Sequence, residues 1–561
     1  MVDFKASFDF TNEESMAEIK FLVNTPITYF KNVEVLKAEE GLEAGQVYST
    51  KGYYEPNDGG GATYLIRTKT NEDVEDNGFI LSLKNISLVA ELLIEDEFLN
   101  VKQLGAKGDG STDDTSVIQL ALAKGRSLWF PKGTYYISST LEPENVVITG
   151  ENRSNTKIVS NLDIFAPISN VTISNLYFIT ENNKVAVKPQ QRASNIVVQW
   201  CICENGCLFY NYRYSPYTTT LTDSDLSSNL QVLSCECIGS DNITEGICFN
   251  YAKDCKAIGN KITGKRHGID WWGGDSDTSR DGLLSNSRYA KNIIIANNIV
   301  KNVRGGIWGG MGENITVSNN YVENCLDVGI DFEGCFNCSA TGNVVRECKN
   351  SCLATFFWSK NIVFDSNSCY QSGSVGTGMY THKNHSQIEY QVCTTVLSNN
   401  SFECGTIGTM SVDAIGQLNI TGNIFTDSCI TADANNAGDF IISNNLVTFT
   451  KDLTEDVVAI LCGRPIRNAT HFITGNKIRF LGTTTNNTIG IKTRQSAYSQ
   501  KTKVFITNNI VENCASSILA SFEGKNAGQP DYAYVYHNFV SGTITSEGTN
   551  GTLYEEDNTV I

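Results

Sequence analysis

A short asparagine turn recurs along most of the chain and constrains its fold more than any other feature. From about residue 145 onward, runs of β-branched residues are each followed by a Gly-Asn or Asn-Asn turn, at spacings of 22 to 24 residues, or 31 to 38 where residues are inserted. Leucine-rich repeats share this period but need a fixed Leu pattern and a helix, whereas these repeats are rich in Ile, Val, Thr and Asn. The repeat predicts an all-β fold, a single-stranded right-handed parallel β-helix (β-solenoid). Its ten turns are marked by Asn260, Asn298, Asn320, Asn343, Asn367, Asn400, Asn423, Asn445, Asn476 and Asn509.

The repeated asparagines should stack on one another. Identical turns on successive coils let each side-chain amide bond the amide above and the amide below, as in other parallel stacks of strands. Asparagine also tolerates the left-handed backbone conformation that a sharp bend requires. We therefore expect an asparagine ladder, with each turn asparagine at the bend itself.

The start of the solenoid should be covered by a helix, because an open coil would expose sheet edges and apolar core. Asp113 and Asp114 precede an amphipathic stretch from Thr115 to Lys124, and the acidic start complements the helix dipole. We assign residues 97–144 to this capping helix and the first strands, and residues 145–520 to the β-helix with a glycan groove.

The same region carries a family resemblance. The segment GAKGDGSTDDTSVIQLAL, followed closely by WFPKGTYYI, resembles the opening signature of pectate-lyase-like β-helix proteins. That superfamily includes polygalacturonases, pectate lyases and bacteriophage tailspikes. The resemblance implies the fold and a carbohydrate partner more firmly than it implies a reaction.

Residues 1–96 form a separate predicted unit. Its central segment, KGYYEPNDGGGATYLIR, resembles the small adaptor domains that precede the β-helix in many phage tailspikes, and its three glycines predict a tight turn between strands. The resemblance implies attachment to phage tail or baseplate proteins, a place in the virion, action at the host cell surface and a homotrimer. Residues 521–561 are expected to form a short, strand-rich C-terminal cap.

Composition excludes several other functions. A formal net charge of −18 and the lack of a basic run argue against nucleic acid as a partner. The sequence contains no run of about 18 apolar residues, so no membrane span is predicted. The segment MVDFKASFDFTNEE lacks the features of a secretory signal. The 18 cysteines are expected to be reduced and mostly buried. Pairs such as Cys335 and Cys338 can also bind metal, but no four-ligand Cys/His set has zinc spacing, so neither a metal nor a cofactor is predicted.

One strand of each coil carries a second repeated pattern. The segments RHGIDWWGG, RGGIWGGMG, DVGIDFEGC and SCLATFF follow four successive turns, each at about ten or eleven residues from the turn asparagine. If Ile269, Ile307, Ile330 and Leu353 point into the core, alternation along the strands creates two outward columns. The first column is Asp270, Trp308, Asp331 and Ala354, and the second is Trp272, Gly310, Glu333 and Phe356.

Carboxylates in these columns are the candidate catalytic residues. Asp331 and Glu333 lie two residues apart on one strand, with Cα atoms roughly 6.5 to 7 Å apart, a separation that suits the acid and base of an inverting glycosidase. Asp270, two coils away, is near enough to join them. The alternative interpretation, that these are ordinary solubilising acids on an exposed sheet, applies to most surface carboxylates.

The neighbouring residues suggest that the columns bind sugar. Exposed tryptophans offer faces on which sugars stack, whereas Trp271 is expected to fill the core. An inserted loop at residues 273–292 can wall a groove, and its acids Asp275, Asp277 and Asp281 lack the pattern of an EF-hand calcium loop. Aligning the next coil brings Tyr380 and His382 into the columns, and the coil after that brings Ser411 and Asp413. The predicted substrate-binding residues are Trp272, Trp308, His267, Arg266, Arg304, Phe356, Tyr380 and His382.

Three functions fit these residues. The leading hypothesis is a tailspike-like endo-glycosidase, a polysaccharide depolymerase that hydrolyses a bacterial surface polysaccharide with Asp331, Glu333 and Asp270. A polysaccharide lyase would instead use Arg266, His267 and Arg304 to hold a uronate and remove its proton, although the tandem carboxylates would repel such a substrate. A non-catalytic receptor-binding adhesin would hold glycan in the same groove without cutting it.

Overall fold

The structure is a computed structural model. It describes residues 28–561 except 95, 212–220, 241–243, 275–287, 358, 374–375, 382–392, 414–415, 433–438, 464–468, 486, 495–501, 523–530 and 550. The chain divides into two compact units, one of residues 1–159 with 173–177, the other of residues 160–172 with 178–561. Residues 275–287 of the loop that was expected to wall a groove, with Asp275, Asp277 and Asp281, lie outside the described residues, as does His382.

The first unit begins with a five-stranded sheet, in the order β1-β2-β3-β5-β4. β1 and β2 are parallel and the other pairs are antiparallel. Tyr64 and Ile66 of β3 alternate with outward residues and are fully buried, as is Leu36 of the short helix beside the sheet. The predicted glycine turn lies in the connection from β2 to β3, with Gly59 in the left-handed region. The elements are β1 (Thr28–Phe30), α2 (Val33–Ala38), β2 (Val47–Thr50), β3 (Thr63–Thr68), β4 (Ile80–Ser82) and β5 (Leu88–Leu93).

The helix predicted after Asp113 and Asp114 is present as α3 (Thr115–Ala123). The two acidic residues before the helix were expected to complement the helix dipole, but their hydrogen bonds differ from each other. Asp114 makes no side-chain cap on the helix and instead accepts hydrogen bonds from the backbone N–H groups of Lys107 and Gly108, while Asp113 accepts one from the N–H of Thr115. Around α3 lie β6 (Leu99–Asn100), η1 (Val101–Leu104), β7 (Asp109–Asp113), β8 (Leu128–Phe130), β9 (Gly133–Tyr136), β10 (Val147–Gly150) and β11 (Thr156–Ser160).

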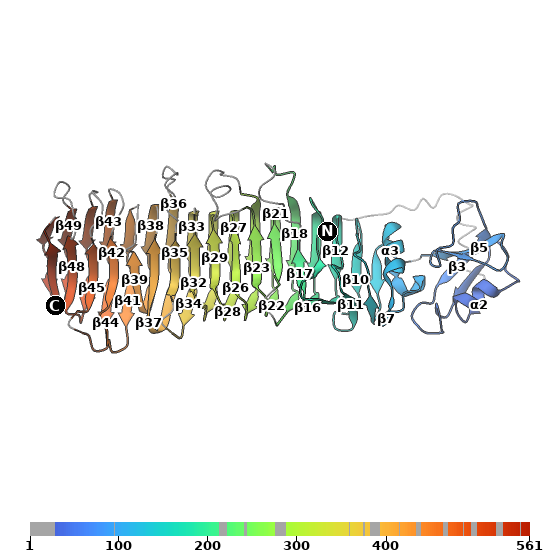
Figure 1. Ribbon diagram of the computed structural model, residues 1–561, viewed down its shortest axis with the longest axis horizontal. Coiled ribbons are helices and arrows are strands. Elements are labelled where there is room, and N and C mark those ends of the chain that lie inside the picture. Colours follow the sequence, from blue (N-terminus) through green and yellow to red (C-terminus); the bar gives the residue numbers. More distant parts are fainter. Residues whose placement is uncertain are drawn as a thin grey trace, which may run out of the picture. The chain divides into compact units, whose positions relative to one another are not determined.

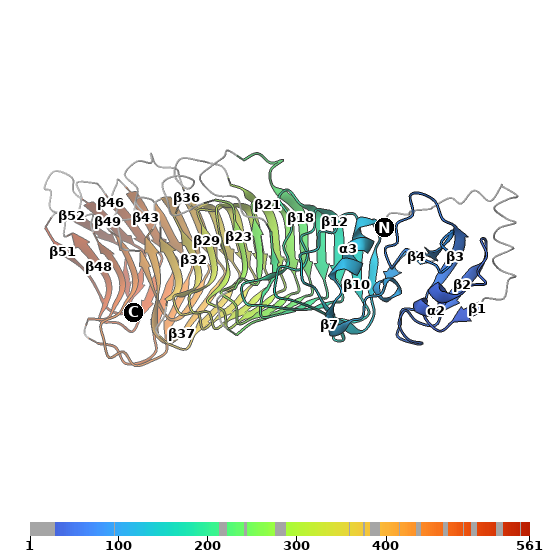
Figure 2. The same ribbon diagram turned by 45° about the vertical axis from the view of Figure 1, so that its right-hand side comes forward.

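The second unit is the predicted parallel β-helix, with strands of successive coils side by side (Figures 1 and 2). We call its three parallel sheets I, II and III, in the order in which each coil visits them. Sheet I contains β12 (Ser169–Ser174), β15 (Ser194–Gln199), β18 (Ser227–Leu233), β21 (Ala252–Ile258), β24 (Ala290–Ala296), β27 (Gly312–Ser318), β30 (Phe336–Thr341), β33 (Lys360–Asp365), β36 (Cys393–Ser398), β38 (Gly416–Thr421), β40 (Phe440–Ser443), β43 (Ala469–Thr474), β46 (Thr502–Thr507), β49 (Asp531–Tyr536) and β52 (Gly551–Glu556).

Sheet II is made of short strands, and sheet III carries the candidate site. Two long strands, β37 (Ser401–Asp413) and β39 (Ile424–Ala432), pass through both sheets. Sheet II otherwise contains β13 (Tyr177–Thr180), β16 (Ile202–Glu204), β19 (Glu236–Ile238), β22 (Lys261–Thr263), β25 (Ile299–Lys301), β28 (Tyr321–Glu323), β31 (Val344–Arg346), β34 (Ser368–Gln371), β41 (Leu446–Phe449), β44 (Lys477–Phe480), β47 (Ile510–Glu512), β50 (Phe539–Val540) and β53 (Thr559–Val560). Sheet III otherwise contains β14 (Val185–Val187), β17 (Cys207–Tyr210), β20 (Ile247–Asn250), β23 (His267–Trp272), β26 (Gly305–Gly310), β29 (Val328–Glu333), β32 (Ser351–Phe356), β35 (Gly376–Thr381), β42 (Val458–Gly463), β45 (Ile489–Arg494), β48 (Ser516–Phe522) and β51 (Thr543–Gly548).

The asparagine ladder is present at the corner between sheets I and II. The side-chain amide of Asn298 donates to Oδ1 of Asn320 at 2.9 Å, and Asn320 donates to Asn343 at 3.0 Å. The same pattern runs from Asn260 to Asn509 and on through Asn538 to Asn558. One expectation was wrong: the left-handed residue is the one before each ladder asparagine, where the bend is sharpest. The ladder asparagine follows the bend, so its amide points inward to its neighbours.

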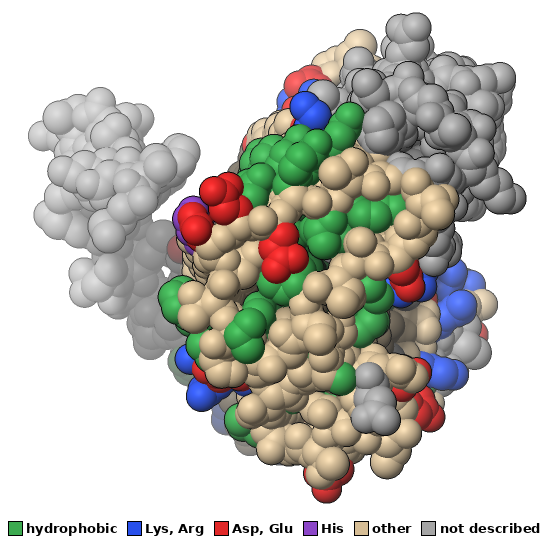
Figure 3. All heavy atoms as spheres, turned by 90° about the vertical axis from the view of Figure 1, so that its left-hand side faces the viewer, with side chains coloured by type: hydrophobic (Ala, Val, Ile, Leu, Met, Phe, Trp, Pro, Cys, Tyr) green, Lys and Arg blue, Asp and Glu red, His purple; other side chains and the backbone are tan. Residues whose placement is uncertain are grey.

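The last coils continue the same ladder of strands. β49 pairs with β52 and β50 with β53, all in parallel, so residues 531–561 extend the solenoid rather than forming a different kind of structure. Seen from this end, hydrophobic side chains lie at the surface between backbone and polar groups (Figure 3), and the exposed ones include Phe539, Val560 and Ile561.

Two further findings concern the sequence-based expectations. Every cysteine whose side chain is described is buried and free of a disulfide, as predicted. Among the described residues, no helix has the length and apolar character needed to cross a membrane.

Candidate functional site

The candidate site lies on four neighbouring strands of sheet III, β23, β26, β29 and β32. Their register is the one predicted from the sequence. Ile269, Ile307, Ile330 and Leu353 are fully buried in the core. The first outward column therefore contains Asp270, Trp308, Asp331 and Ala354, and the second contains Trp272, Gly310, Glu333 and Phe356.

The acids of the first column are buried, which corrects the expectation that they face solvent. Asp270 is 6% exposed and Asp331 is 5% exposed, whereas Glu333 is partly exposed. Successive coils lie only about 4.8 Å apart, and Trp308 stands between the two acids in the column, paired with each of them on the neighbouring strands. Trp272 packs against Trp308 with ring centroids 6.2 Å apart. Trp271 fills the core, as expected.

A cavity of about 160 Å³ opens where these strands meet the corner from sheet II. It brings together six residues that were predicted from the sequence, from three successive coils. The volume is below the roughly 300 to 1,000 Å³ of typical small-molecule pockets, so the cavity is too small to enclose a whole ligand of that size. Its lining consists of Arg266, His267, Arg304, Gly305, Trp308, Asp327, Val328, Asp331 and Glu333.

Three buried polar atoms of residues that line this cavity lack hydrogen-bond partners among the described residues: Oδ1 of Asp331, the indole N–H of Trp308 and Nδ1 of His267. Leaving a buried polar group unpaired costs about 1 to 3 kcal/mol, and such groups recur at ligand sites. Burial, and then the nearby charge of Glu333, raise the pKa of Asp331 well above its ordinary value. The cavity therefore presents a carboxyl that tends to keep its proton beside a free indole donor.

The basic side chains of the cavity are His267 and two arginines, Arg266 and Arg304. The imidazole of His267 lies over Trp308, with ring centroids 4.7 Å apart. Its Nδ1 is 2.9 Å from Oε2 of Glu245, an electrostatic contact whose geometry is not that of a hydrogen bond. Arg266 lies 3.6 Å from the same carboxylate. The guanidinium of Arg304 has no ion-pair partner among the described residues.

Glu245 and Asp327 were missed by the sequence analysis, although a signal was present. The segment EGI that contains Glu245 has the same spacing as HGI on the next coil, because Ile247 pairs with Ile269. Asp327 stands three residues before Ile330, as Arg304 stands three before Ile307. Extending the alignment to the preceding coil would have found Glu245. Extending it to the position three residues before the core isoleucine would have found Asp327.

Several predicted site residues lie outside the cavity. Asp270 accepts a hydrogen bond from the thiol of Cys248 at 2.9 Å. Trp272 and Phe356 lie in the second column without lining the cavity. The placement of Tyr380 was wrong: Gly378 takes the core position opposite Leu353, so Met379 and Thr381 occupy the columns and Tyr380 pairs with Thr355. On the following coil the columns contain Ser411 and Asp413, as expected.

Comparisons with known proteins agree with this fold. Residues 98–331 match a family model described as "Rhamnogalacturonase A/epimerase, pectate lyase-like", and residues 276–392 match one described as "Right handed beta helix region". The similar solved structures include the pre-mature gene product 12 of bacteriophage phi29, at 12% identity and a TM-score of 0.46, covering 82% of this chain and 73% of that one. The two family-model matches confirm the predicted resemblance to pectate-lyase-like β-helix proteins.

Curated relatives match only in part. The preneck appendage protein of Bacillus phage PZA is 25% identical over 229 residues, which is 34% of this chain and 26% of that protein. A probable glucan endo-1,3-beta-glucosidase of Arthroderma benhamiae is 52% identical over 60 residues, 10% of this chain and 7% of that protein. An uncharacterized protein derived from the SPbeta prophage of Bacillus subtilis is 28% identical over 259 residues, 40% of this chain and 38% of that protein. The chain thus spans between 7% and 38% of the length of these three relatives.

Proposed function

Because the chain is a right-handed parallel β-helix protein of the pectate-lyase-like superfamily, we propose that it binds a bacterial surface polysaccharide on sheet III and cleaves it there as an endo-glycosidase. One observation carries this proposal: a buried carboxyl with an unpartnered oxygen, Asp331, shares a cavity with a second carboxylate, Glu333, and an aromatic ring, Trp308. A purely structural sheet face gains nothing from such an arrangement.

Asp331 is proposed as the general acid. A general acid must hold a proton at the working pH, and burial raises the pKa of Asp331 in the required direction. Asp331 lines the cavity and its buried Oδ1 has no partner among the described residues, so the carboxyl is proposed to donate its proton to the oxygen of a glycosidic bond.

Glu333 is proposed as the base that activates water. It is more exposed than Asp331 and lies two residues further along β29, so the two Cα atoms are roughly 6.5 to 7 Å apart. That spacing is at the lower limit of the inverting geometry. Asp327, which also lines the cavity, is the second candidate for this role. Asp270 lies outside the cavity and is proposed only as a supporting charge.

The remaining lining residues are proposed to hold the sugar. Trp308 offers a partly exposed ring and a free N–H, and Arg304 offers a guanidinium for a hydroxyl or an acidic substituent. Arg266 and His267 are further basic side chains of the cavity, although both are close to Glu245.

A lyase is the second candidate, and one observation favours it. Both arginines and His267 line the same cavity as the acids, so a uronate carboxylate can be held by the arginines while His267 takes the neighbouring proton. This mechanism produces an unsaturated sugar that absorbs near 235 nm, which hydrolysis does not.

The test is an assay of reducing ends and of absorbance at 235 nm on capsular and O-antigen polysaccharides. Wild type is compared with Asp331→Asn and Glu333→Gln, and Glu313→Gln, on the outer face of sheet I, serves as the control. Hydrolysis predicts new reducing ends without absorbance, and a loss of about 10²- to 10⁴-fold in both site variants. Absorbance identifies a lyase. Binding without any cleavage contradicts an enzyme and leaves an adhesin.

Two proposals about assembly accompany the enzymatic one. We propose that residues 1–96 attach the protein to a phage tail, as the resemblance of KGYYEPNDGGGATYLIR implies. We further propose a homotrimer in a virion that acts at the host cell surface. Light scattering of the purified protein measures the mass of the assembly directly.

A further inference from the structure

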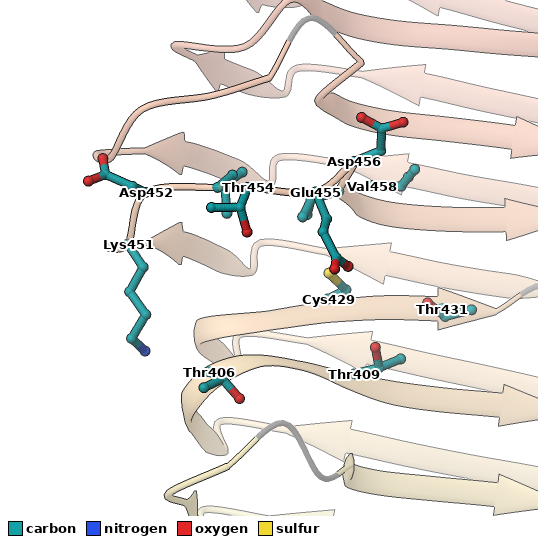
Figure 4. Close-up of a pocket in the computed structure, with 12 residues that line it drawn as sticks. Thr406, Thr409, Cys429, Thr431, Lys451, Asp452, Thr454, Glu455, Asp456 and Val458 are labelled. Carbon is teal, nitrogen blue, oxygen red and sulfur yellow. The ribbon is translucent and has the colours of Figure 1, made fainter.

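A second, larger cleft lies on sheet III, nearer the C-terminal end of the stack, and its volume is about 610 Å³. Figure 4 shows residues that line it. The floor is formed by Thr409 of β37 and by Cys429 and Thr431 of β39, and one wall is formed by the loop that leads into β42.

The cleft exists because one coil turns its corner more tightly than its two neighbours. Only three residues separate Thr426 from Ile430 on β39, whereas six separate their partners Glu403 and Met410 on the preceding coil. On the following coil, eleven residues separate Thr448 from Ile460. The middle coil is therefore recessed between two protruding corners.

The wall of the cleft is held firmly in place. Asp427, at the tight corner, has φ +52° and is 2% exposed. Its carboxylate accepts hydrogen bonds of 2.7 Å from the backbone N–H and the hydroxyl of Thr450 and from Nζ of Lys451. Lys451 also donates to the carbonyl of Cys404 at 2.9 Å. The loop that walls the cleft is thus fastened to the coil below it.

The acidic side chains of the wall differ in whether they already accept hydrogen bonds from the protein. Asp452 accepts a hydrogen bond from the N–H of Thr483, and Asp456 accepts hydrogen bonds from Thr485 and Asn487. Both carboxylates therefore bind residues of the next coil. Glu455 has no partner among the described residues. In Figure 4 its carboxylate reaches down from the wall over the floor, towards Cys429.

The chemistry of the cleft favours an uncharged, hydroxyl-rich ligand. The charge of Lys451 is offset by Asp427, which leaves the carboxylates of Asp452, Glu455 and Asp456 to repel an anion. Threonine hydroxyls and the Glu455 carboxylate are partners for sugar hydroxyls. Among the described residues, no aromatic side chain lines this cleft, unlike the first cavity.

Strand register relates the two sites. Asp331 pairs through Ala354, Met379 and Ser411 to Thr431, so Thr431 lies in the same outward column four coils away. At about 4.8 Å per coil, the distance along the stack is about 19 Å. A single polysaccharide that follows sheet III passes over both.

We propose that the cleft over β39 is a second glycan subsite, which binds an uncharged sugar of the polymer whose other part occupies the Asp331 cavity. This inference rests on the proposed glycan-binding function and extends it. The protein then recognises a segment of polymer at least four coils long, with unlike sugars at its two ends.

The test measures affinity in the full-length Asp331→Asn protein, so that cleavage does not consume the ligand. The probes are the capsular and O-antigen polysaccharides of the assay above and their fragments of graded length, prepared by partial acid hydrolysis. Glu455→Gln and Thr431→Val are compared with Thr316→Val, a partly exposed threonine on sheet I. Calorimetric titration gives the dissociation constants, and thermal melts verify that each variant folds.

The expected result is an increase of about tenfold in the dissociation constant of long fragments in both cleft variants. The dissociation constants of fragments too short to span the two sites should not change in the cleft variants. The Thr316→Val control should leave the dissociation constants of all fragments unchanged. Unchanged affinity for long fragments in both variants overturns the inference while leaving the proposed function intact. If affinity depends on the cleft but wild type does not cleave the polysaccharide, the second subsite is supported and the proposed enzymatic function is overturned. A lack of binding to every polysaccharide overturns both the subsite and the proposed function.

Discussion

Two stacks of polar residues run along the same coils and differ in one respect. In the asparagine ladder, each buried amide bonds the amides of the coils on both sides and backbone carbonyls as well. In the outward column of sheet III, Asp331 and Trp308 are also buried or partly buried, yet each leaves a polar atom without a partner among the described residues. A solenoid can satisfy every stacked polar group when the coils are identical. The column on sheet III leaves polar atoms without hydrogen-bond partners, which is the property expected of a ligand-binding surface.

The largest effect should come from breaking the ladder. Asn445→Ala removes two hydrogen bonds that Asn445 accepts from Asn423 and two that it donates, to Ile420 and Asn476. At about 1 kcal/mol for each bond, the free energy of unfolding should fall by about 4 kcal/mol. Urea unfolding measures the change.

A matched control is available on the neighbouring coil. Asn419 is partly exposed on sheet I, and its side-chain oxygen has no partner among the described residues. Asn419→Ala should therefore change the free energy of unfolding by no more than about 0.5 kcal/mol. Equal losses in the two variants would contradict a special role for the ladder.

A smaller, pH-dependent effect should distinguish Asp331 from the ladder. Burial raises the pKa of Asp331 in the folded state, so the folded protein holds a proton that the unfolded chain releases above about pH 3.9. This contribution to stability is complete below that pH and decreases by about 1.4 kcal/mol per pH unit as the pH rises towards the folded pKa. Asp331→Asn removes the dependence.

Unfolding wild type and Asp331→Asn in urea between pH 4 and pH 8 tests this sign. The variant should gain stability relative to wild type as the pH rises. A variant that instead loses stability at high pH would mean that Asp331 is ionised and paired in the folded protein, and the proposed acid role would be wrong.

The smallest effect should come from Trp308. Trp308→Phe keeps an aromatic ring over the cavity but removes the indole N–H, which has no partner in the described structure. Stability should change little, while affinity for the glycan should fall by up to about tenfold, the value of one hydrogen bond. Trp200→Phe, an exposed tryptophan on the chain between sheets I and II, is the control. A loss of stability without a loss of affinity would make Trp308 a packing residue.

The sequence predicted the parts of the molecule that repeat. The turn spacing and the alternation of Ile269, Ile307 and Ile330 determine both fold and register, because a one-residue slip would turn core residues outward. Where the repeat is interrupted, prediction failed: the insertion before β35 shifted Tyr380 out of the column by one residue. Register can be inferred only from coils that keep the same length.

Burial and the partners of the site could not be predicted in the same way. Alternation gives the direction of the Asp331 side chain but not its burial, which depends on the side chains of the neighbouring coils. The contact of His267 with Glu245 joins residues 22 positions apart on neighbouring coils. The cleft over β39 depends on the relative lengths of three corners, which no single repeat reveals.

The central claim, that glycan is cleaved at the Asp331 cavity, is tested most directly by a crystal structure of Asp331→Asn with an oligosaccharide of a susceptible polysaccharide. The predicted result is a sugar ring on Trp308, with a glycosidic oxygen within hydrogen-bond distance of the residue 331 side chain and Glu333 on the opposite side of the ring. Oligosaccharide bound elsewhere, with the cavity between Trp308 and Glu333 empty, would contradict the account.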